Sequence, residues 1–318
     1  MFIAQAFKPG NEFWKYLVGS VIVIGASFVG QIPLTIAIMA EALSKGEIPT
    51  NTQALLSYLD LNLTLFLLLL SFAFAMLGLW IVVRKMHNQK FKDIVTSRAK
   101  TDWKRVFFAF SVWGVFSVGM ILLVHYTEPG KYILQFNPAQ FAILAIIAVL
   151  MIPVQTSVEE LVFRGYLMQG FGLLAKNRWF PLVMTSVIFG VMHIANPEIG
   201  QMGYIALVYY IGTGFALGIM TLMDEGTELA LGFHAVNNLT AALLVTSDWS
   251  AFQTHSVFKD VSDPSAGIDI ILPVVVIYPL LLLLFSYKYK WTGWKEKLTG
   301  RVYPQKEIEI NEIGQKYE

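Results

Sequence analysis

Long runs without a charged residue are the feature of this 318-residue chain that most limits its fold. A membrane-spanning helix needs about 20 consecutive apolar residues, and seven charge-free runs reach or approach that length. An eighth apolar run is shorter, at sixteen residues, and we expect it to be helical too. The eight predicted spans cover residues 16–40, 61–83, 106–124, 133–158, 179–194, 199–223, 229–247 and 270–287.

The composition supports a membrane protein. Hydrophobic residues make up 56% of the chain, charged residues only 14%, and the mean hydropathy is +0.59. These values lie outside the usage of soluble globular proteins. The first span is also too long for the apolar core of a signal peptide, so we expect it to stay in the mature protein. The predicted fold class is therefore an all-α, polytopic membrane helical bundle.

The basic residues predict how the bundle is oriented. Eight lysines and arginines lie in the loop 84–105, which the positive-inside tendency places in the cytoplasm. Alternation from that loop puts both termini in the cytoplasm too. The segments 249–267 and 301–318 read as a surface loop and a polar, disordered tail. The formal net charge of +1 is not gathered on one basic face, so the expected partner is the lipid bilayer and not nucleic acid.

Three charges lie within six positions of an otherwise apolar stretch: Glu159, Glu160 and Arg164. Each charge costs about 2.5–3.5 kcal/mol near the middle of a membrane helix, so their presence indicates function. Glu160 and Arg164 are four residues apart on one helix face, which predicts an internal ion pair. Glu159 points about 100° away and is left as an unpaired carboxylate, suited to a general base. Because Pro153 precedes them, we expect a kink or a helix that projects into the cytoplasm.

Two of the five histidines, His193 and His234, lie within predicted spans. A single histidine in a membrane helix more often forms a hydrogen bond between helices than takes part in catalysis. Two of them, together with an unpaired glutamate, favour chemistry. Phe189 precedes His193 by one helical turn and would form an aromatic wall beside its imidazole.

Asn237 and Asn238 follow His234 at the spacing that places side chains on one helix face. An imidazole and a carboxamide together would suit an oxyanion, the negative charge that forms when water attacks a carbonyl. A set of this kind can hydrolyse an amide. Glu159, helped by His193, would take a proton from water, and His234 with Asn238 would hold the oxyanion.

Several hydrolytic chemistries are excluded by what the sequence lacks. There is no cysteine, no His-Glu-x-x-His motif of zinc proteases and no Gly-x-Ser-x-Gly elbow. Zinc held by Glu159, His193 and His234 with an open fourth position is left open. We favour a reaction without metal or other cofactor, because Glu160 is expected to be held by Arg164.

The residues around Glu159, His193 and His234 form three motifs that follow one another along the chain. Together these motifs resemble the CAAX protease and bacteriocin-processing (CPBP, or Abi) family of intramembrane glutamic endopeptidases, which includes the type II CAAX prenyl proteases. Together they are quite specific, although each alone would be weak. The resemblance covers about residues 143–245. The motifs are Glu159-Glu160-x-x-x-Arg164, Phe189-x-x-x-His193 and His234-x-x-x-Asn238.

The resemblance implies catalytic roles for Glu159 and His193 in activating water and for His234 and Asn238 in the oxyanion site. We expect a catalytic core at 131–250, preceded by three helices in 1–130 and followed by a last helix and tail in 251–318, which carry none of the resemblance. Eukaryotic and archaeal relatives resemble enzymes that trim prenylated CAAX proteins, whereas bacterial relatives are linked to bacteriocin maturation or self-immunity. We therefore expect a bacterial plasma-membrane endopeptidase acting on a membrane-associated or prenylated-like protein or a bacteriocin-type peptide. A non-catalytic immunity or scaffold protein, or a transporter with a Glu/His proton relay, is the alternative.

Overall fold

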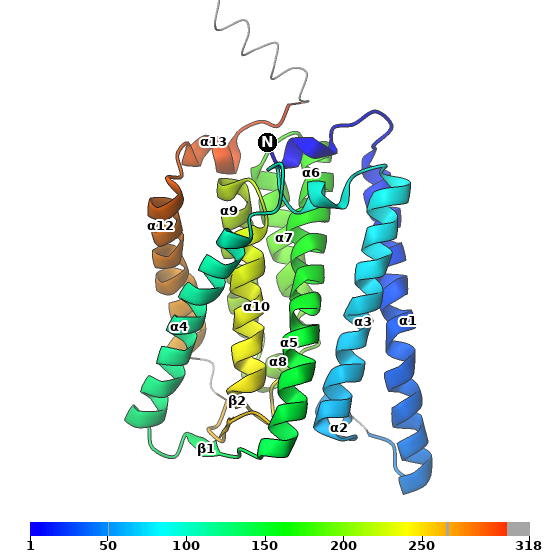
Figure 1. Cartoon of the computed structure of the whole chain (residues 1–318), viewed down its shortest axis with the longest axis vertical. Helices are drawn as coiled ribbons and strands as arrows, with labels where there is room; N and C mark the ends of the chain where they lie inside the picture. The colour runs from blue at the N-terminus through cyan, green and yellow to red at the C-terminus, as the bar shows by residue number, and fades with distance from the viewer. Residues whose placement is uncertain (50, 265–266, 304–318) are drawn as a thin grey trace, which may run out of the picture.

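A computed structural model describes residues 1–49, 51–264 and 267–303 of the chain. Long helices stand side by side in it and short elements cover both ends (Figure 1), which confirms the predicted all-α membrane bundle. The predicted tail lies largely outside the described residues. The long helices are α1 (Phe13–Lys45), α3 (Leu61–Ile81), α4 (Trp103–Thr127), α5 (Pro138–Glu160), α7 (Trp179–Met192), α9 (Ala206–Asp224), α10 (Glu228–Leu243) and α12 (Tyr278–Tyr289).

The remaining helical elements are short. Some of them are π-helical extensions of the long helices, and others are single turns near the ends of the bundle. They are α2 (Thr52–Leu56), α6 (Met168–Ala175), α8 (Pro197–Met202), α11 (Ile268–Leu272), α13 (Trp294–Thr299), the 3-10 turns η1 (Ile3–Ala6) and η3 (Phe91–Ile94), and the π segments η2 (Val82–Met86), η4 (Leu161–Leu167) and η5 (Pro273–Ile277).

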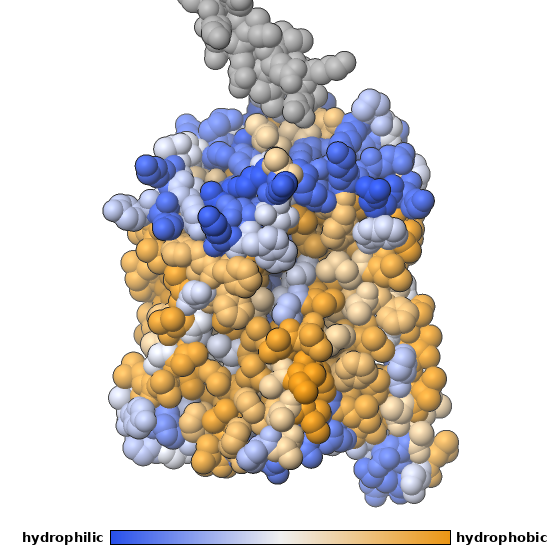
Figure 2. All heavy atoms as spheres, in the orientation of Figure 1, coloured by the Kyte–Doolittle hydropathy of each residue, from blue (hydrophilic) through white to orange (hydrophobic). Residues whose placement is uncertain are grey.

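On the face that Figure 2 shows, a broad apolar belt lies between one strongly hydrophilic end and an opposite end where hydrophilic side chains gather again. Within the described residues, six helical runs are long and apolar enough to cross a membrane. Each predicted span has a helix in the structure, but α7 and α10 are only 14 and 16 residues long. The chain is thus a multi-pass membrane protein, and the number of eight crossings stays a prediction.

A small sheet lies at the end of the bundle that carries α8 (Figure 1). Strand β3 (Phe258–Asp260) pairs antiparallel with β1 (Tyr132–Leu134) and parallel with β2 (Val245–Thr246). Two expectations are therefore wrong: the segment 249–267 is not a plain surface loop, and the span predicted from residue 133 begins as a strand. The sequence does not separate the apolar residues of β1 from the adjacent helix, because strand pairing between distant segments leaves no local signal.

Helix α5 begins only at Pro138, because Asn137 caps it. The Asn137 side chain accepts hydrogen bonds from the backbone N–H groups of Ala139 and Gln140, and proline is well suited to the first helical position. From there the helical run continues for 38 residues to Ala175, through Pro153 and through η4. The π segment η4 follows the two glutamates directly, and such segments are frequent at functional sites.

Two further spans differ from prediction. The run 199–223 is not one helix, because Gly203, with φ of 75°, separates α8 from α9. This left-handed conformation suits glycine, which has no Cβ. Helix α7 ends at Met192, so His193, expected near the end of the span 179–194, is the C-cap residue of the helix.

Helices α7 and α9 pack closely because glycines face the partner helix. A Cβ on Gly190 would lie 3.0 Å from the backbone nitrogen of Ile211, and one on Gly214 would lie 2.8 Å from the backbone oxygen of Ser186. These distances leave no room for a larger residue without a shift of one helix. The close approach also leaves the backbone oxygen of Gly214 on α9 within reach of Arg164 on η4.

The basic loop 84–105 folds onto the turn between α9 and α10. Arg98 lies 2.9 Å from the carboxylate of Asp224 and 3.1 Å from that of Glu228, and Arg105 also contacts Asp224. This end of the bundle carries the N-terminus as well (Figure 1). The acidic turn is thus neutralised by the loop predicted to be cytoplasmic, and the sidedness itself stays a prediction.

Candidate functional site

Glu160 and Arg164 form the predicted ion pair in the interior of the bundle. Arg164 Nη1 lies 2.9 Å from Glu160 Oε1, and both side chains are 0% exposed. The guanidinium also stacks 4.2 Å from the ring centroid of Phe189 and donates to the backbone oxygen of Gly214 at 3.5 Å. A buried charge of this kind is tolerated because it is paired, even though Glu160 Oε2 and Arg164 Nε are buried without a hydrogen-bond partner among the described residues.

His234 on α10 lies between the two glutamates. Its Nδ1 is 2.7 Å from Glu160 Oε1 and its Nε2 is 3.5 Å from Glu159 Oε2. An ionised carboxylate only accepts hydrogen bonds, so Nδ1 donates to Glu160. This bond fixes the orientation of the imidazole and turns Nε2 toward Glu159.

Glu159 has a partner that the sequence reading missed. Gln155 Nε2 donates to Glu159 Oε1 at 2.6 Å, and the Glu159 side chain is 16% exposed. The expectation of an unpaired carboxylate is therefore wrong in this respect. The signal was available, because Gln155 precedes Glu159 by four residues on the same helix face.

A chain of side-chain hydrogen bonds leads from α4 to Glu159. Trp113 Nε1 donates to Asn237 Oδ1 at 3.1 Å, Asn237 Nδ2 to Asn238 Oδ1 at 3.2 Å, and Asn238 Nδ2 to Gln155 Oε1 at 3.1 Å. An indole N–H can only donate and an ionised carboxylate can only accept. The two ends therefore fix the direction of every bond in the chain. Trp113 was not predicted, although a tryptophan in the middle of a span, away from the interfaces, was a usable signal.

His193 occupies a different part of the site. Its Nδ1 is 2.7 Å from the backbone oxygen of Phe189, to which it donates, so Nε2 is the nitrogen left for other partners. The ring lies 4.7 Å from that of Phe189, as the spacing predicted, and stacks on Tyr210 with centroids 4.2 Å apart. The structure thus brings Glu159 into ion-pair distance of His234, and it holds His193 against two aromatic rings.

The possible zinc ligands are Glu159, His193 and His234. Glu159 and His234 lie within ion-pair distance of each other, and His193 donates through Nδ1 to Phe189, which leaves Nε2 for other partners. Among the described residues no group of three or more histidine or acidic side chains has the geometry to hold a metal ion.

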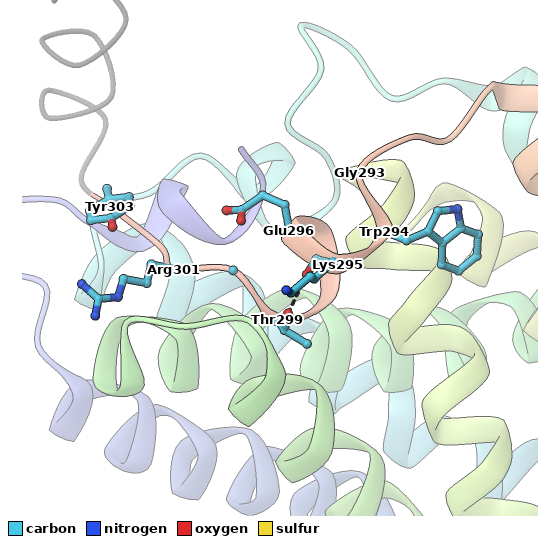
Figure 3. Close-up of a pocket in the computed structure, with 8 residues that line it drawn as sticks. Gly293, Trp294, Lys295, Glu296, Thr299, Arg301 and Tyr303 are labelled. Atoms are coloured by element: carbon cyan, nitrogen blue, oxygen red, sulfur yellow. Dashed lines mark hydrogen bonds between the residues drawn. The ribbon is translucent and has the colours of Figure 1, made fainter. Parts of the chain in front are cut away.

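A separate surface hollow beside α13 includes none of these residues (Figure 3). It has a volume of about 790 Å³ and is lined by residues between Gly293 and Tyr303. The bond that Thr299 donates to the backbone oxygen of Lys295, at 2.7 Å, belongs to the α13 turn. This hollow offers no acid–histidine pair, so the candidate site remains the one between α5, α7 and α10.

Comparison with known proteins identifies the family of the chain. The family model of the Type II CAAX prenyl endopeptidase Rce1-like proteins matches residues 138–240, which contain both glutamates, Arg164, both histidines and Asn238. The chain belongs to this family of membrane peptidases, and the predicted resemblance is confirmed. Over 250 residues it is 32% identical to the uncharacterized protein YyaK of Bacillus subtilis (strain 168), covering 78% of this chain and 83% of that protein. No solved structure matches it.

Proposed function

We propose that this protein is an intramembrane endopeptidase that hydrolyses a peptide bond of a membrane-associated protein or peptide, with Glu159 as the general base. The observation that carries the proposal is the pair formed by Glu159 and His234. It is held from one side by Gln155 and from the other by Glu160, which Arg164 neutralises. The Glu160 carboxylate thereby has a structural role, and the Glu159 carboxylate is available for proton transfer.

In the first step Glu159 takes a proton from a water molecule, assisted by His193 through Nε2. The oxygen of that water forms a bond to the scissile carbonyl carbon, and the C=O electron pair moves onto the carbonyl oxygen. His234, donating through Nε2 when protonated, and the second N–H of Asn238 hold the resulting oxyanion. Glu160 supports this role because a carboxylate at Nδ1 stabilises positive charge on the ring.

In the second step the oxyanion re-forms the C=O bond and the C–N bond breaks. Glu159 returns the proton it accepted to the leaving nitrogen, so an amine and a carboxylic acid are released and the base is regenerated. No group beyond water and the side chains of this chain is needed for this balance. We therefore propose a reaction without metal.

The substitution Glu159→Gln tests the proposal, because it keeps the size and the contact with Gln155 but removes the base. Membranes from cells that express the wild type or the variant are compared by mass spectrometry of released peptides. We expect cleavage products in the wild type alone, with unchanged protein level and unchanged thermal unfolding in both. Glu41→Gln, on a side chain of α1 that is 41% exposed, is the control and should keep cleavage.

The same comparison separates the alternatives. Products that persist with Glu159→Gln would rule out this residue as the base. A cellular phenotype that persists while no products are found would support a non-catalytic immunity or scaffold protein. If the purified wild type loses cleavage in the presence of a chelator and regains it when zinc is added, the metal-free mechanism is refuted.

A further inference from the structure

A second cavity lies next to the candidate site, at the end of the bundle that carries α8 and the small sheet (Figure 1). It has a volume of about 540 Å³ and lies among the ends of α4 and α9, strand β1, and helices α8 and α11. Ligand cavities have volumes of this order, about 300–1,000 Å³. The basic loop 84–105 lies at the opposite end of the bundle.

Tyr210 joins this cavity to the candidate site. Its side chain lines the cavity, and its ring stacks on the imidazole of His193 at a centroid distance of 4.2 Å with an interplanar angle of 19°. Its hydroxyl accepts a hydrogen bond from Asn196 at 3.3 Å, which holds the ring in place. A chain bound in the cavity would therefore lie one aromatic ring away from a proposed catalytic histidine.

The charge of the lining is strongly negative. Among the described residues Lys131 is the only basic side chain of the lining, and it is paired with Glu128 at 3.1 Å. Five carboxylates against one lysine leave four negative charges in excess when all are ionised. Among the described residues no three of these groups have the geometry to hold one metal ion, so the charge is spread along the cavity. The acidic side chains are Glu128, Glu198, Asp260, Asp263 and Asp269.

Two polar atoms of residues in the lining are buried and have no hydrogen-bond partner within the part of the chain that the structure describes. Glu198 Oε1 accepts from the backbone N–H of Ala251 at 2.8 Å, but Glu198 Oε2 has no donor, and the indole N–H of Trp249 has no acceptor. Burial raises the pKa of Glu198, and the N–H of Ala251 offsets this only in part. A missing acceptor and a missing donor in one cavity call for a ligand that supplies both.

A polypeptide with basic side chains meets these requirements. An arginine or lysine side chain supplies N–H groups and positive charge to the carboxylates, and the backbone supplies a carbonyl to Trp249. The faces of Tyr209, Tyr210 and Trp249, which also line the cavity, can stack on a guanidinium. A single small cation would satisfy the charge but would leave the indole unpaired.

We propose that this cavity is a substrate subsite that binds an arginine- or lysine-containing segment of a polypeptide, next to the bond that Glu159 cleaves. The role of the cavity as a substrate subsite rests on the proposed endopeptidase function. Binding of a basic peptide in the cavity can be measured without cleavage.

Binding is therefore measured directly, with the full chain carrying Glu159→Gln in nanodiscs of phosphatidylcholine. The probe is an acetylated pentapeptide amide of alternating glycine and arginine with a neutral dye, and the matched peptide has glutamine in place of arginine. We expect the arginine peptide to bind at least about tenfold more tightly, and less tightly as salt is raised. Glu198→Gln, which keeps the contact with Ala251, should weaken binding by at least about fivefold.

Asp269→Asn on the exposed start of α11 is a second variant that does not depend on the buried carboxylate, and it should weaken binding as well. Glu41→Gln, on an exposed side chain of α1 outside the cavity, is the control and should change binding less than about twofold. Equal binding of the two peptides, or full binding by both Glu198→Gln and Asp269→Asn, would overturn the proposal. If the arginine peptide binds selectively but the wild-type protein releases no cleavage products, the proposed endopeptidase function is refuted and the peptide-binding cavity is not.

Discussion

Removal of the Arg164 guanidinium by Arg164→Met is the sharpest test of how the site is held together. Methionine keeps much of the unbranched side chain but leaves Glu160 with His234 as its remaining side-chain partner. The pair is 0% exposed and 2.9 Å apart. Breaking a buried pair by removing one member costs about 3–5 kcal/mol, because the other charge stays buried and uncompensated. The stacking on Phe189 at 4.2 Å is lost as well.

The chain contains a matched control with the same helical spacing. Lys45 and Glu41 are also four residues apart, with 3.0 Å between their charged atoms, but their side chains are 48% and 41% exposed. An exposed pair of this kind contributes about 0–1 kcal/mol. Lys45→Met should therefore leave stability almost unchanged, and the difference between the two variants isolates the effect of burial.

The assay is reversible unfolding of the purified protein in mixed micelles, titrated with SDS at constant temperature and followed by tryptophan fluorescence. The double variant Glu160→Gln with Arg164→Met removes both charges, and we expect it to recover at least about 2 kcal/mol relative to Arg164→Met alone. The description of a buried, coupled pair is wrong if Arg164→Met lowers the free energy of unfolding no more than Lys45→Met does. It is also wrong if the effects of Glu160→Gln and Arg164→Met on that free energy are additive.

Two other predictions concern Gln155 and His87. Gln155→Leu removes the bond to Glu159 at 2.6 Å, and kcat should fall about tenfold to a hundredfold with KM unchanged, because Gln155 positions the base and does not touch substrate. Gln140→Leu, on the same helix but bonded to Asn62, is the control, and an equal loss of kcat there would contradict the positioning role. Burial, and secondarily the charge of Lys15, lowers the pKa of His87 from 6.5 to about 4. The unfolded chain then binds the proton first, so stability is complete above pH 6.5 and is lost as the pH falls toward 4. His87→Gln should reduce the dependence of the unfolding free energy on pH between pH 7 and pH 5. An unchanged slope in the variant would refute the role of His87 in this dependence.

Local sequence patterns were sufficient for the helices and for part of the site. Charge-free runs of membrane-spanning length predicted the bundle, because apolar length is a property of each segment alone. The four-residue spacing predicted the pair of Glu160 with Arg164 and the contact of Phe189 with His193, because both partners lie on one turn of one helix. The three motifs were also sufficient to recognise the family.

Contacts between helices were not predictable in this way. The rotation and tilt of α10 against α5 decide that His234 reaches both glutamates and that Asn238 meets Gln155. The strand β1 could not be separated from the apolar run of α5, because its partner β3 is more than a hundred positions away. Spacing along one helix fixes which side chains share a face, whereas the packing of several helices decides what that face meets.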